Sequence, residues 1–343
     1  MSDVDRAPRT AREVLARGRT FLERKGVDAS RLDAELLVAH ALGLDRLHLF
    51  LELERPVSQD ELDHARQLLV RRAKGEPVAH LVGVREFYGR DFVVNADVLI
   101  PRPETELLVD LVRERVAPRL REPEPGAEHP QSQPSQEGAA PATAHGRDEG
   151  AAQEAQSPNE AQAPNEHRSA TPTPSPTLRI ADLGTGSGCL AVTLALELPD
   201  AEVVASDVSP EALVVAQNNA QRLGAQVRFV QGDRLTPLLA HGPFDWIVSN
   251  PPYVDVAAEL APEVREHEPS LALFAPKGDP DHFALLLARE GLALVRPGGG
   301  LLVELGFDQA ERLVPLLEPQ GLDLHLHDDL AGVQRVLEIR KPG

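Results

Sequence analysis

The residues best suited to chemistry in this chain are Asn250, Pro251, Pro252 and Tyr253, which directly follow the apolar run 244–248. The run has the composition of a buried strand, and proline cannot donate to a strand ladder, so the backbone should leave the sheet at Asn250. The Asn250 amide and the Pro251 carbonyl are then two acceptors that can hold both hydrogens of a planar NH₂ group, while Tyr253 stacks on its face. A plain proline turn at the end of a strand fits the same residues.

An earlier predicted strand runs into a glycine-rich loop. Residues 178–183 have the composition of a short strand, and a helix with apolar residues at helical spacing begins near Leu190. Glycines between a strand and a helix let the backbone approach a ligand at the helix N-terminus. The loop consists of Gly184, Thr185, Gly186, Ser187 and Gly188. A structural turn without a ligand has the same composition, so the loop alone leaves both interpretations open.

Acidic residues follow the next two predicted strands. The strand at 201–206 ends at Asp207, roughly 20 residues after the last loop glycine, a spacing at which dinucleotide folds place an acceptor for ribose hydroxyls. The strand at 227–230 ends near Asp233. Open α/β sheets bind their ligands at the carboxyl ends of strands, which is where both acids are expected.

The elements that position these residues form an alternating α/β region in the second half of the chain. A fifth strand is expected at 300–305 after a turn at 297–299, and strands at 322–327 and 335–340 have the pattern of a hairpin. The loop spells G-x-G-x-G and not the G-x-G-x-x-G of dinucleotide folds. Together with the terminal hairpin, this spelling separates the region from a dehydrogenase.

The first part of the chain, to about Lys74, is predicted to be a small helical bundle. Apolar residues recur there at helical spacing behind candidate caps. The capping pairs are Thr10 with Glu13, Ser58 with Glu61 and, as a weaker match, Ser30 with Asp33. The bundle shows no chemistry of its own, so a scaffold is its simplest role.

Between the bundle and the α/β region, the chain predicts a hairpin centred on Gly89 and then a proline-bracketed segment leading into a helix at about 105–116. This segment carries Arg102, Glu104 and Glu106. Without further information, the three side chains fit a solvated charge cluster.

A low-complexity segment lies in the middle of the chain, at 121–177. It contains no Leu, Ile, Val, Met, Phe, Tyr or Trp and is rich in Pro, Glu, Gln, Ser and Ala. Such a composition cannot bury enough apolar surface to offset the entropy of ordering, so a disordered surface insert is expected.

Composition limits the class of protein. The chain has 343 residues, a net charge of −19 and one cysteine. An acidic chain is poorly suited to track a phosphate backbone, and a lone cysteine rules out an intrachain disulfide framework. No secretory signal and no bilayer-length apolar stretch is visible. We therefore expect a cytoplasmic protein that does not bind nucleic acid directly or enter a membrane.

With these residues assembled, the chain resembles the class I S-adenosylmethionine methyltransferases and, more narrowly, the HemK/PrmC family, the glutamine methyltransferases of peptide chain release factors. The resemblance covers nearly everything except 121–177. Its motifs are Phe-Tyr-Gly at 87–89, Ile-Pro-Arg-Pro-Glu-Thr-Glu at 100–106, Asp-Leu-Gly-Thr-Gly-Ser-Gly at 182–188, Val-Ser-Asn-Pro-Pro-Tyr at 248–253 and Glu-Leu-Gly at 304–306.

The resemblance implies a role for each candidate residue. The loop from Gly184 to Gly188 would approach the methionine part of S-adenosylmethionine, Asp207 the ribose hydroxyls, and Asp233 with Arg234 the adenine. The catalytic and substrate-binding group would be Asn250, Pro251, Pro252 and Tyr253, with Asn250 also beside the cofactor. Arg102 and Glu104 would help to close the pocket. No metal is implied.

The resemblance also implies the architecture. It predicts an α/β class I methyltransferase fold: a Rossmann-like seven-stranded sheet with an antiparallel C-terminal hairpin, in which the first and fourth strands are neighbours. The expected domains are a helical substrate-recognition domain at 1–75, a β-hairpin linker at 76–105 and a methyltransferase domain at 106–343. The partners are release factors, and the protein is expected to be a monomer.

Two departures and two alternatives accompany the resemblance. Arg234 stands where family members often carry an aromatic residue, and the segment 274–282 departs from the usual Gly-Gly-x-Asp-Gly spelling. A DNA amino-methyltransferase acting on adenine N6 or cytosine N4 would use the same Asn-Pro-Pro-Tyr element, but no basic, aromatic-interleaved region supports it. A non-catalytic adaptor is hard to reconcile with an intact pocket spelling.

Overall fold

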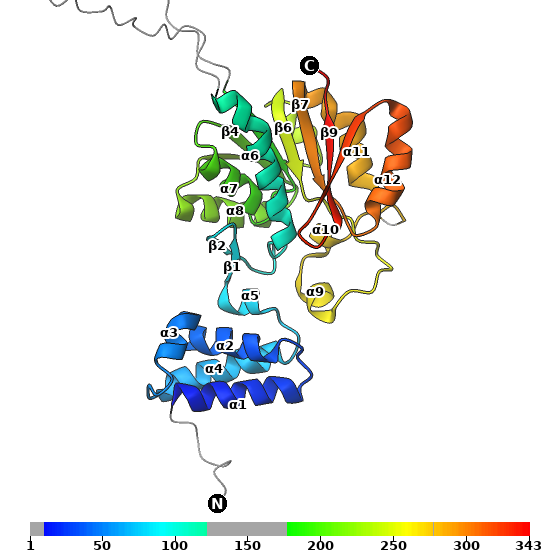
Figure 1. Cartoon of the computed structure of the whole chain (residues 1–343). Helices are drawn as coiled ribbons and strands as arrows, with labels where there is room; N and C mark the ends of the chain where they lie inside the picture. Colours follow the sequence, from blue (N-terminus) through cyan, green and yellow to red (C-terminus); the bar gives the residue numbers. More distant parts are fainter. Residues whose placement is uncertain (1–9, 122–176, 277) are drawn as a thin grey trace, which may run out of the picture. The chain divides into compact units, whose positions relative to one another are not determined.

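The computed structural model describes residues 10–121, 177–276 and 278–343 (Figure 1). Apart from its two end residues, the predicted low-complexity insert at 121–177 lies outside the described residues. No helix in the described part of the chain is both long enough and apolar enough to span a bilayer.

The N-terminal helices pack around an apolar core of their own, which includes Leu22, Leu37 and Leu68. The helices are α1 (Ala11–Arg24), α2 (Ser30–Ala41), α3 (Arg46–Leu51), α4 (Gln59–Arg72) and the short α5 (Val78–Val82). The predicted helical bundle is therefore present.

The helix caps follow two of the three predicted pairs. Thr10 accepts the Glu13 N–H, and Ser58 with Glu61 forms a complete capping box. The third pair was wrong: α2 has Ala29 at its cap, with Ser30 as its first helical residue. The Asp33 carboxylate is engaged elsewhere, because it accepts a hydrogen bond of 2.6 Å from Arg72 Nε.

A hairpin of β1 (Val84–Phe87) and β2 (Arg90–Val93) follows, as predicted. Its two turn residues, Tyr88 and Gly89, have φ values of 53° and 71°. Positive φ at both positions is what a two-residue turn needs to match the twist of the strands. The chain then enters a 3₁₀ turn, η2 (Pro103–Thr105), and helix α6 (Glu106–Arg121).

One seven-stranded sheet organises the rest of the described chain. Its order is β5-β4-β3-β6-β7-β9-β8, with parallel pairing from β5 to β7 and antiparallel pairing of β9 with both neighbours. The strands are β3 (Arg179–Leu183), β4 (Glu202–Asp207), β5 (Val227–Gln231), β6 (Phe244–Ser249), β7 (Val295–Glu304), β8 (Asp323–Asp328) and β9 (Gln334–Arg340). The predicted sheet, its terminal hairpin and the adjacency of its first and fourth strands are confirmed.

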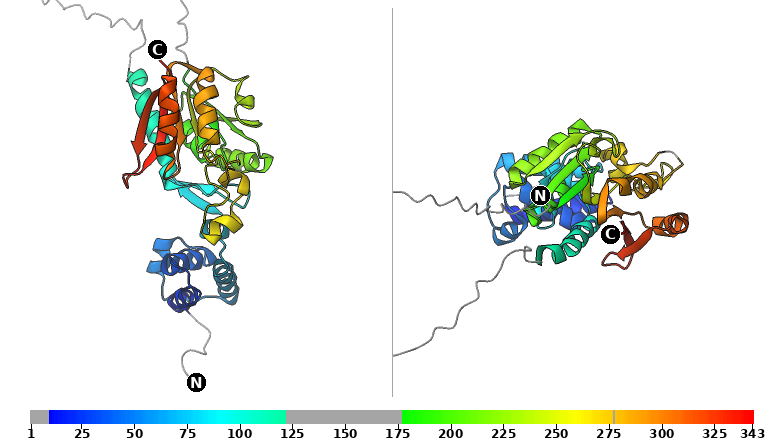
Figure 2. Two further views of the ribbon diagram at one scale, coloured as in Figure 1. Left: turned by 90° about the vertical axis from the view of Figure 1, so that its right-hand side faces the viewer. Right: turned by 90° about the horizontal axis from the view of Figure 1, so that it is seen from above.

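Helices cover both faces of this sheet (Figures 1 and 2). One apolar core joins the sheet to α6, α7 (Cys189–Glu197) and α8 (Pro210–Leu223). A second core joins the other face to α11 (His282–Glu290) and α12 (Gln309–Leu317). Two short helices, α9 (Pro262–His267) and α10 (Ser270–Leu273), lie in the connection after β6. Strands covered on both faces explain why β6 is buried throughout.

The turn predicted at 297–299 was wrong, because these residues lie within β7. The pairing of β7 with β6 shifts register between Phe244 and Trp246, so the glycines form an irregularity inside the strand. A Cβ on Gly299 would lie 2.1 Å from the Asp245 carbonyl oxygen, and one on Gly300 would lie 2.7 Å from the Trp246 ring. These two glycines are therefore required by the close approach of β7 to β6 and not by a turn.

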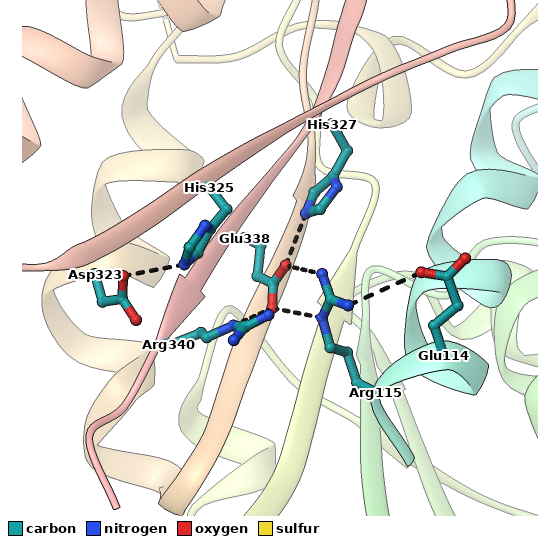
Figure 3. Close-up of polar contacts among 7 residues, drawn as sticks. All are labelled: Glu114, Arg115, Asp323, His325, His327, Glu338 and Arg340. Carbon is teal, nitrogen blue, oxygen red and sulfur yellow. Dashed lines mark hydrogen bonds and ion pairs between the residues drawn. The ribbon is translucent and has the colours of Figure 1, made fainter. Parts of the chain in front are cut away.

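A buried ion-pair cluster ties α6 to the C-terminal hairpin (Figure 3). Glu338 on β9 accepts two hydrogen bonds from Arg115, at 2.9 and 2.8 Å, and one of 2.6 Å from Arg340. His327 Nε2 lies 2.7 Å from the same carboxylate. Burial alone would raise the pKa of Glu338, but these partners outweigh it and hold the pKa at about 2.

Candidate active site

The glycine loop and Asn250 lie at the same edge of the sheet because the strands that carry them are neighbours. Strands β3 and β6 run parallel, with Leu183 paired to Ser249 at their ends. The Ser249 hydroxyl donates to the Leu183 carbonyl at 2.8 Å, which ties the two strand ends together. The loop after β3 and Asn250 after β6 consequently open into one crevice.

A cavity of about 250 Å³ occupies this crevice. Most of the residues predicted from the sequence line it, namely Gly184, Thr185, Gly186, Ser187, Asp207, Asp233, Arg234, Asn250, Pro251, Pro252 and Arg102. Three predicted residues, Gly188, Tyr253 and Glu104, are not among its lining residues.

The glycine loop presents bare backbone to the cavity. Gly184 and Gly186 have φ values of 73° and 54°, and a Cβ on either would meet no atom within 4 Å. A side chain there would stand in the cavity, so glycine keeps this wall open for a ligand. Gly188 has a different role, since its Cβ would lie 2.9 Å from that of Ala216 on α8. It allows close packing between the loop and that helix.

The loop is held in place by side chains from two other elements, β4 and α8. Asp207, at the end of β4, accepts the Gly186 N–H through one carboxylate oxygen and the Ser209 N–H through the other, both at 2.9 Å. Asn219 on α8 donates to the Ser187 carbonyl at 2.9 Å and also binds the backbone of Val93 on β2. The sequence reading missed Asn219, because no local pattern marks an interior helix residue as a tether.

Asp182, the last acid before the loop, is fully buried within β3. Its Oδ2 accepts a hydrogen bond of 2.7 Å from the Thr185 hydroxyl, and its Oδ1 has no partner among the described residues. Burial raises the pKa of Asp182 to about 7.

Asp233 and Arg234 lie at the cavity wall after β5. Their side chains form an ion pair of 3.2 Å, and each is more than half exposed. Arg234 has a φ of 51°, unusual for a residue with a side chain. Unlike an aromatic residue at this position, it brings a guanidinium to the wall.

Asn250 is joined to a buried carboxylate through a hydroxyl. Its Nδ2 donates to Thr105 Oγ1 at 3.0 Å, and Thr105 Oγ1 donates to Glu304 Oε2 at 2.6 Å. Burial is the largest influence on Glu304 and raises its pKa to about 7. Thr105 and Glu304 lie within the motifs at 100–106 and 304–306, but the sequence assigned neither residue a role. The signal that could have identified Glu304 is its place as an acid at the end of β7, the strand next to β6, which Asn250 follows.

Arg102 lines the cavity with its guanidinium fixed from behind. Its Nη2 donates to Glu268 Oε1 at 2.6 Å, and the other oxygen of this buried carboxylate accepts the Ile100 N–H at 3.0 Å. The solvated-cluster alternative thus fails for Arg102 but describes Glu104, which is exposed.

Tyr253 packs beside the cavity and does not line it. A Cβ on Gly306 would lie 3.1 Å from Tyr253 Cδ2, so the ring packs closely against the backbone of this glycine. Burial, followed by the nearby Glu304 carboxyl, raises the pKa of the Tyr253 phenol to about 12. The phenol is therefore neutral and cannot serve as a base near neutral pH.

The residues present fit a nucleoside-type cofactor. The bare loop offers room for a ligand beside Asp207, whose carboxylate has acceptor capacity beyond its two backbone N–H bonds. Apolar walls at Leu183, Val208 and Phe283 suit a flat ring.

Two protein-family models match this chain. Residues 13–83 match the PrmC N-terminal domain, and residues 170–266 match the methyltransferase small domain. Together with the seven-stranded sheet and its terminal hairpin, these matches define a class I methyltransferase with a helical N-terminal domain.

Full-length relatives narrow the class. The chain is 37% identical to a release factor glutamine methyltransferase of Geobacter sulfurreducens, over 96% of this chain and 95% of the relative. It is 39% identical to one of Chlorobaculum tepidum, over 95% of each chain. The chain belongs to the family of release factor glutamine methyltransferases. Among solved structures, it is similar to the human methyltransferase 10 domain containing protein, at 16% identity and a TM-score of 0.43 over 74% of this chain and 90% of that one.

Proposed function

We propose that this chain transfers a methyl group from S-adenosylmethionine to the side-chain amide nitrogen, N5, of the glutamine in the Gly-Gly-Gln motif of peptide chain release factors. The observation that carries the proposal is an amide side chain, Asn250, on the same cavity wall as a bare glycine loop, in a chain of this family. The names of the relatives supply the substrate class.

The cofactor supplies a methyl group bound to a sulfonium. We assign Gly184, Thr185, Gly186, Ser187 and Gly188 to its methionine part, Gly188 acting only by shaping the loop. Asp207 would bind the ribose hydroxyls. Asp233 and Arg234 would border the adenine.

The substrate amide is held by acceptors and not by a base. An amide nitrogen is a poor nucleophile because its lone pair is delocalised into the carbonyl. Asn250 Oδ1 and the Pro251 carbonyl would accept its two N–H bonds and turn the nitrogen toward the methyl group, with Pro252 fixing the backbone and Tyr253 packing alongside. Rate enhancement then comes from positioning and preorganised dipoles, and the nitrogen loses its proton after transfer.

The remaining parts of the chain have separate roles in this proposal. Residues 1–75 would recognise the release factor, 76–105 would link the domains, and 106–343 would carry the chemistry, with Arg102 and Glu104 closing the pocket. We propose a cytoplasmic monomer that does not bind nucleic acid directly. The net charge of −19 opposes the DNA amino-methyltransferase alternative.

The test is a transfer assay with methyl-labelled cofactor and three acceptors. We expect label on an intact release factor, none on a release factor with Gln→Ala in its Gly-Gly-Gln motif, and none on DNA. Label on DNA with the release factor left unmodified would refute the proposal.

A further inference from the structure

The hydrogen bonds behind Asn250 have a fixed direction. A hydroxyl carries one proton, and Thr105 Oγ1 lies 2.6 Å from the Glu304 carboxylate, a strong acceptor that takes this proton. The Thr105 oxygen must then act as the acceptor toward Asn250, so the Asn250 NH₂ group faces Thr105 at 3.0 Å. Among the described residues, the Asn250 side chain makes only this hydrogen bond, through its NH₂ group, so Oδ1 is left for a ligand.

We propose that Thr105 and Glu304 are positioning residues that orient the Asn250 amide with its oxygen toward the substrate. This inference rests on the proposed function and adds two residues to it. Thr105 lines the cavity and Glu304 does not, and both act through Asn250.

Backbone geometry and burial hold in place the two hydrogen bonds that join Glu304, Thr105 and Asn250, here called the relay. Ser249 pairs with Val303, so the next residues are Asn250, just past the end of β6, and Glu304, the last residue of β7. Thr105 reaches them from η2, a turn started by Pro103. Thr105 is 3% exposed and Glu304 is 2% exposed, so water cannot readily replace either partner.

The orientation determines which side chain is accepted. With its oxygen forward, Asn250 offers an acceptor, as does the Pro251 carbonyl, and a glutamine NH₂ group satisfies both. A glutamate carboxylate would place acceptors against acceptors and be rejected. A reversed Asn250 would present its NH₂ group instead and lose this discrimination.

Protonation of Glu304 should weaken the relay. Its neighbours include Thr105, the Tyr253 phenol, the carboxylate of Glu104 and the cations of Arg335 and Arg102, and its pKa is raised to about 7. A neutral carboxyl can donate to Thr105, which frees the hydroxyl proton to point at Asn250 and favours the reversed amide. Turnover should therefore fall as the pH drops through this range.

The experiment compares Thr105→Val with Thr105→Ser and with a matched control, Thr193→Val. Thr193 is a fully buried threonine on α7 whose hydroxyl has no partner among the described residues, and it does not line the cavity. We expect Thr105→Val to lower kcat by about 10- to 100-fold, with KM for cofactor and release factor within about twofold. Thr105→Ser should restore kcat to within about threefold of wild type, and Thr193→Val should leave it unchanged.

A pH series with Glu304→Gln gives an independent measurement should Thr105→Val not fold. The kcat of wild type should fall as the pH is lowered, and in Glu304→Gln this fall should be smaller. Asp182 also has a pKa raised to about 7, so the midpoint of the wild-type pH profile does not by itself identify Glu304. The difference between the profiles of wild type and Glu304→Gln does.

The outcomes separate the two proposals. A wild-type protein that leaves the release factor unlabelled refutes the proposed function. An active wild type whose kcat matches that of folded Thr105→Val, or whose acid limb persists in Glu304→Gln, overturns the relay alone.

Discussion

Two buried glutamates on adjacent strands of one sheet have different hydrogen-bond partners. Glu338 on β9 is 0% exposed and lies among Arg115, Arg340 and His327 (Figure 3). Glu304 at the end of β7 is 2% exposed and has one neutral donor, Thr105. The pKa is about 2 for Glu338 and about 7 for Glu304.

The difference lies in what each carboxylate is bonded to. Desolvation disfavours the charged form of both, but in the described part of the chain only Glu338 is hydrogen-bonded to cations, which outweigh it. The arginines near Glu304 lower its pKa by less than burial raises it. The Glu338 carboxylate, whose charge is balanced by these cations, holds α6 to the terminal hairpin. The Glu304 carboxylate, whose charge is not fully balanced, lies beside a cavity and can change protonation near neutral pH. Such behaviour is typical of functional sites.

The largest expected effect is on methyl transfer, in the cavity region that contains Asn250 and Glu304. Asn250→Ala removes the side-chain acceptor, so we expect methyl transfer to fall about 10²- to 10³-fold, the usual cost of losing one preorganised hydrogen-bonding group. Cofactor affinity should change little. Single-turnover transfer and calorimetric cofactor titration measure the two quantities, and near-normal turnover would count against the assigned role.

Glu338→Ala should show the reverse pattern. It leaves three basic side chains without their common partner, so we expect the free energy of unfolding to fall by about 3 kcal/mol, at the low end for a broken buried pair because the arginines are partly exposed. The kcat of the folded protein should stay within about twofold of wild type. Chemical denaturation and the transfer assay test both statements, and a loss below about 1 kcal/mol would mean that the cluster contributes little.

The pH dependence of stability should have opposite signs at the two glutamates. The folded pKa of Glu304 is raised from 4.5, so its contribution to stability is full below pH 4.5 and is lost as the pH rises through about 7. Glu304→Gln removes this loss, so its free energy of unfolding relative to wild type should rise by about 3 kcal/mol between pH 4.5 and 7.5.

The folded pKa of Glu338 is lowered, so its contribution is present above pH 4.5 and disappears as the pH falls toward 2. Denaturation of wild type and Glu304→Gln across this range tests the sign at Glu304, and the same series with Glu338→Ala tests the sign at Glu338. Parallel curves for the two proteins would contradict the assignment of a raised pKa to Glu304.

The smallest effect is expected at an exposed pair on the same hairpin. Asp323 Oδ1 lies 3.0 Å from His325 Nε2, and both side chains are close to half exposed. Asp323→Asn should change the free energy of unfolding by less than about 0.5 kcal/mol, because solvent screens such pairs. This variant is the control for Glu338→Ala, and a loss of similar size would show that burial does not distinguish the two sites.

Much of the fold and of the cavity wall could be predicted from the sequence, because the informative residues stand at element ends. The strand ending at Asn250, the glycine loop and Asp207 each have a local pattern, and parallel strands bring their ends to one edge. Gly299 was misread because proline followed by glycines has the same spelling in a turn and in an irregular strand.

The hydrogen-bonded partners could not be predicted in this way. Thr105 and Glu304 are 199 positions apart, and Arg115 and Glu338 are 223 apart. Periodicity tells which side chains are buried but not which of them meet. The contrast between the two glutamates depends wholly on such pairings.

Trp246, packed against Gly300 in the middle of the sheet, is the chain's single tryptophan. Its indole fluorescence is consequently a built-in optical probe of the sheet, and the N-terminal helices, which contain no tryptophan or tyrosine, contribute nothing to it. Comparing this emission with far-ultraviolet circular dichroism during unfolding would show, without any label, whether helices and sheet melt together or in turn.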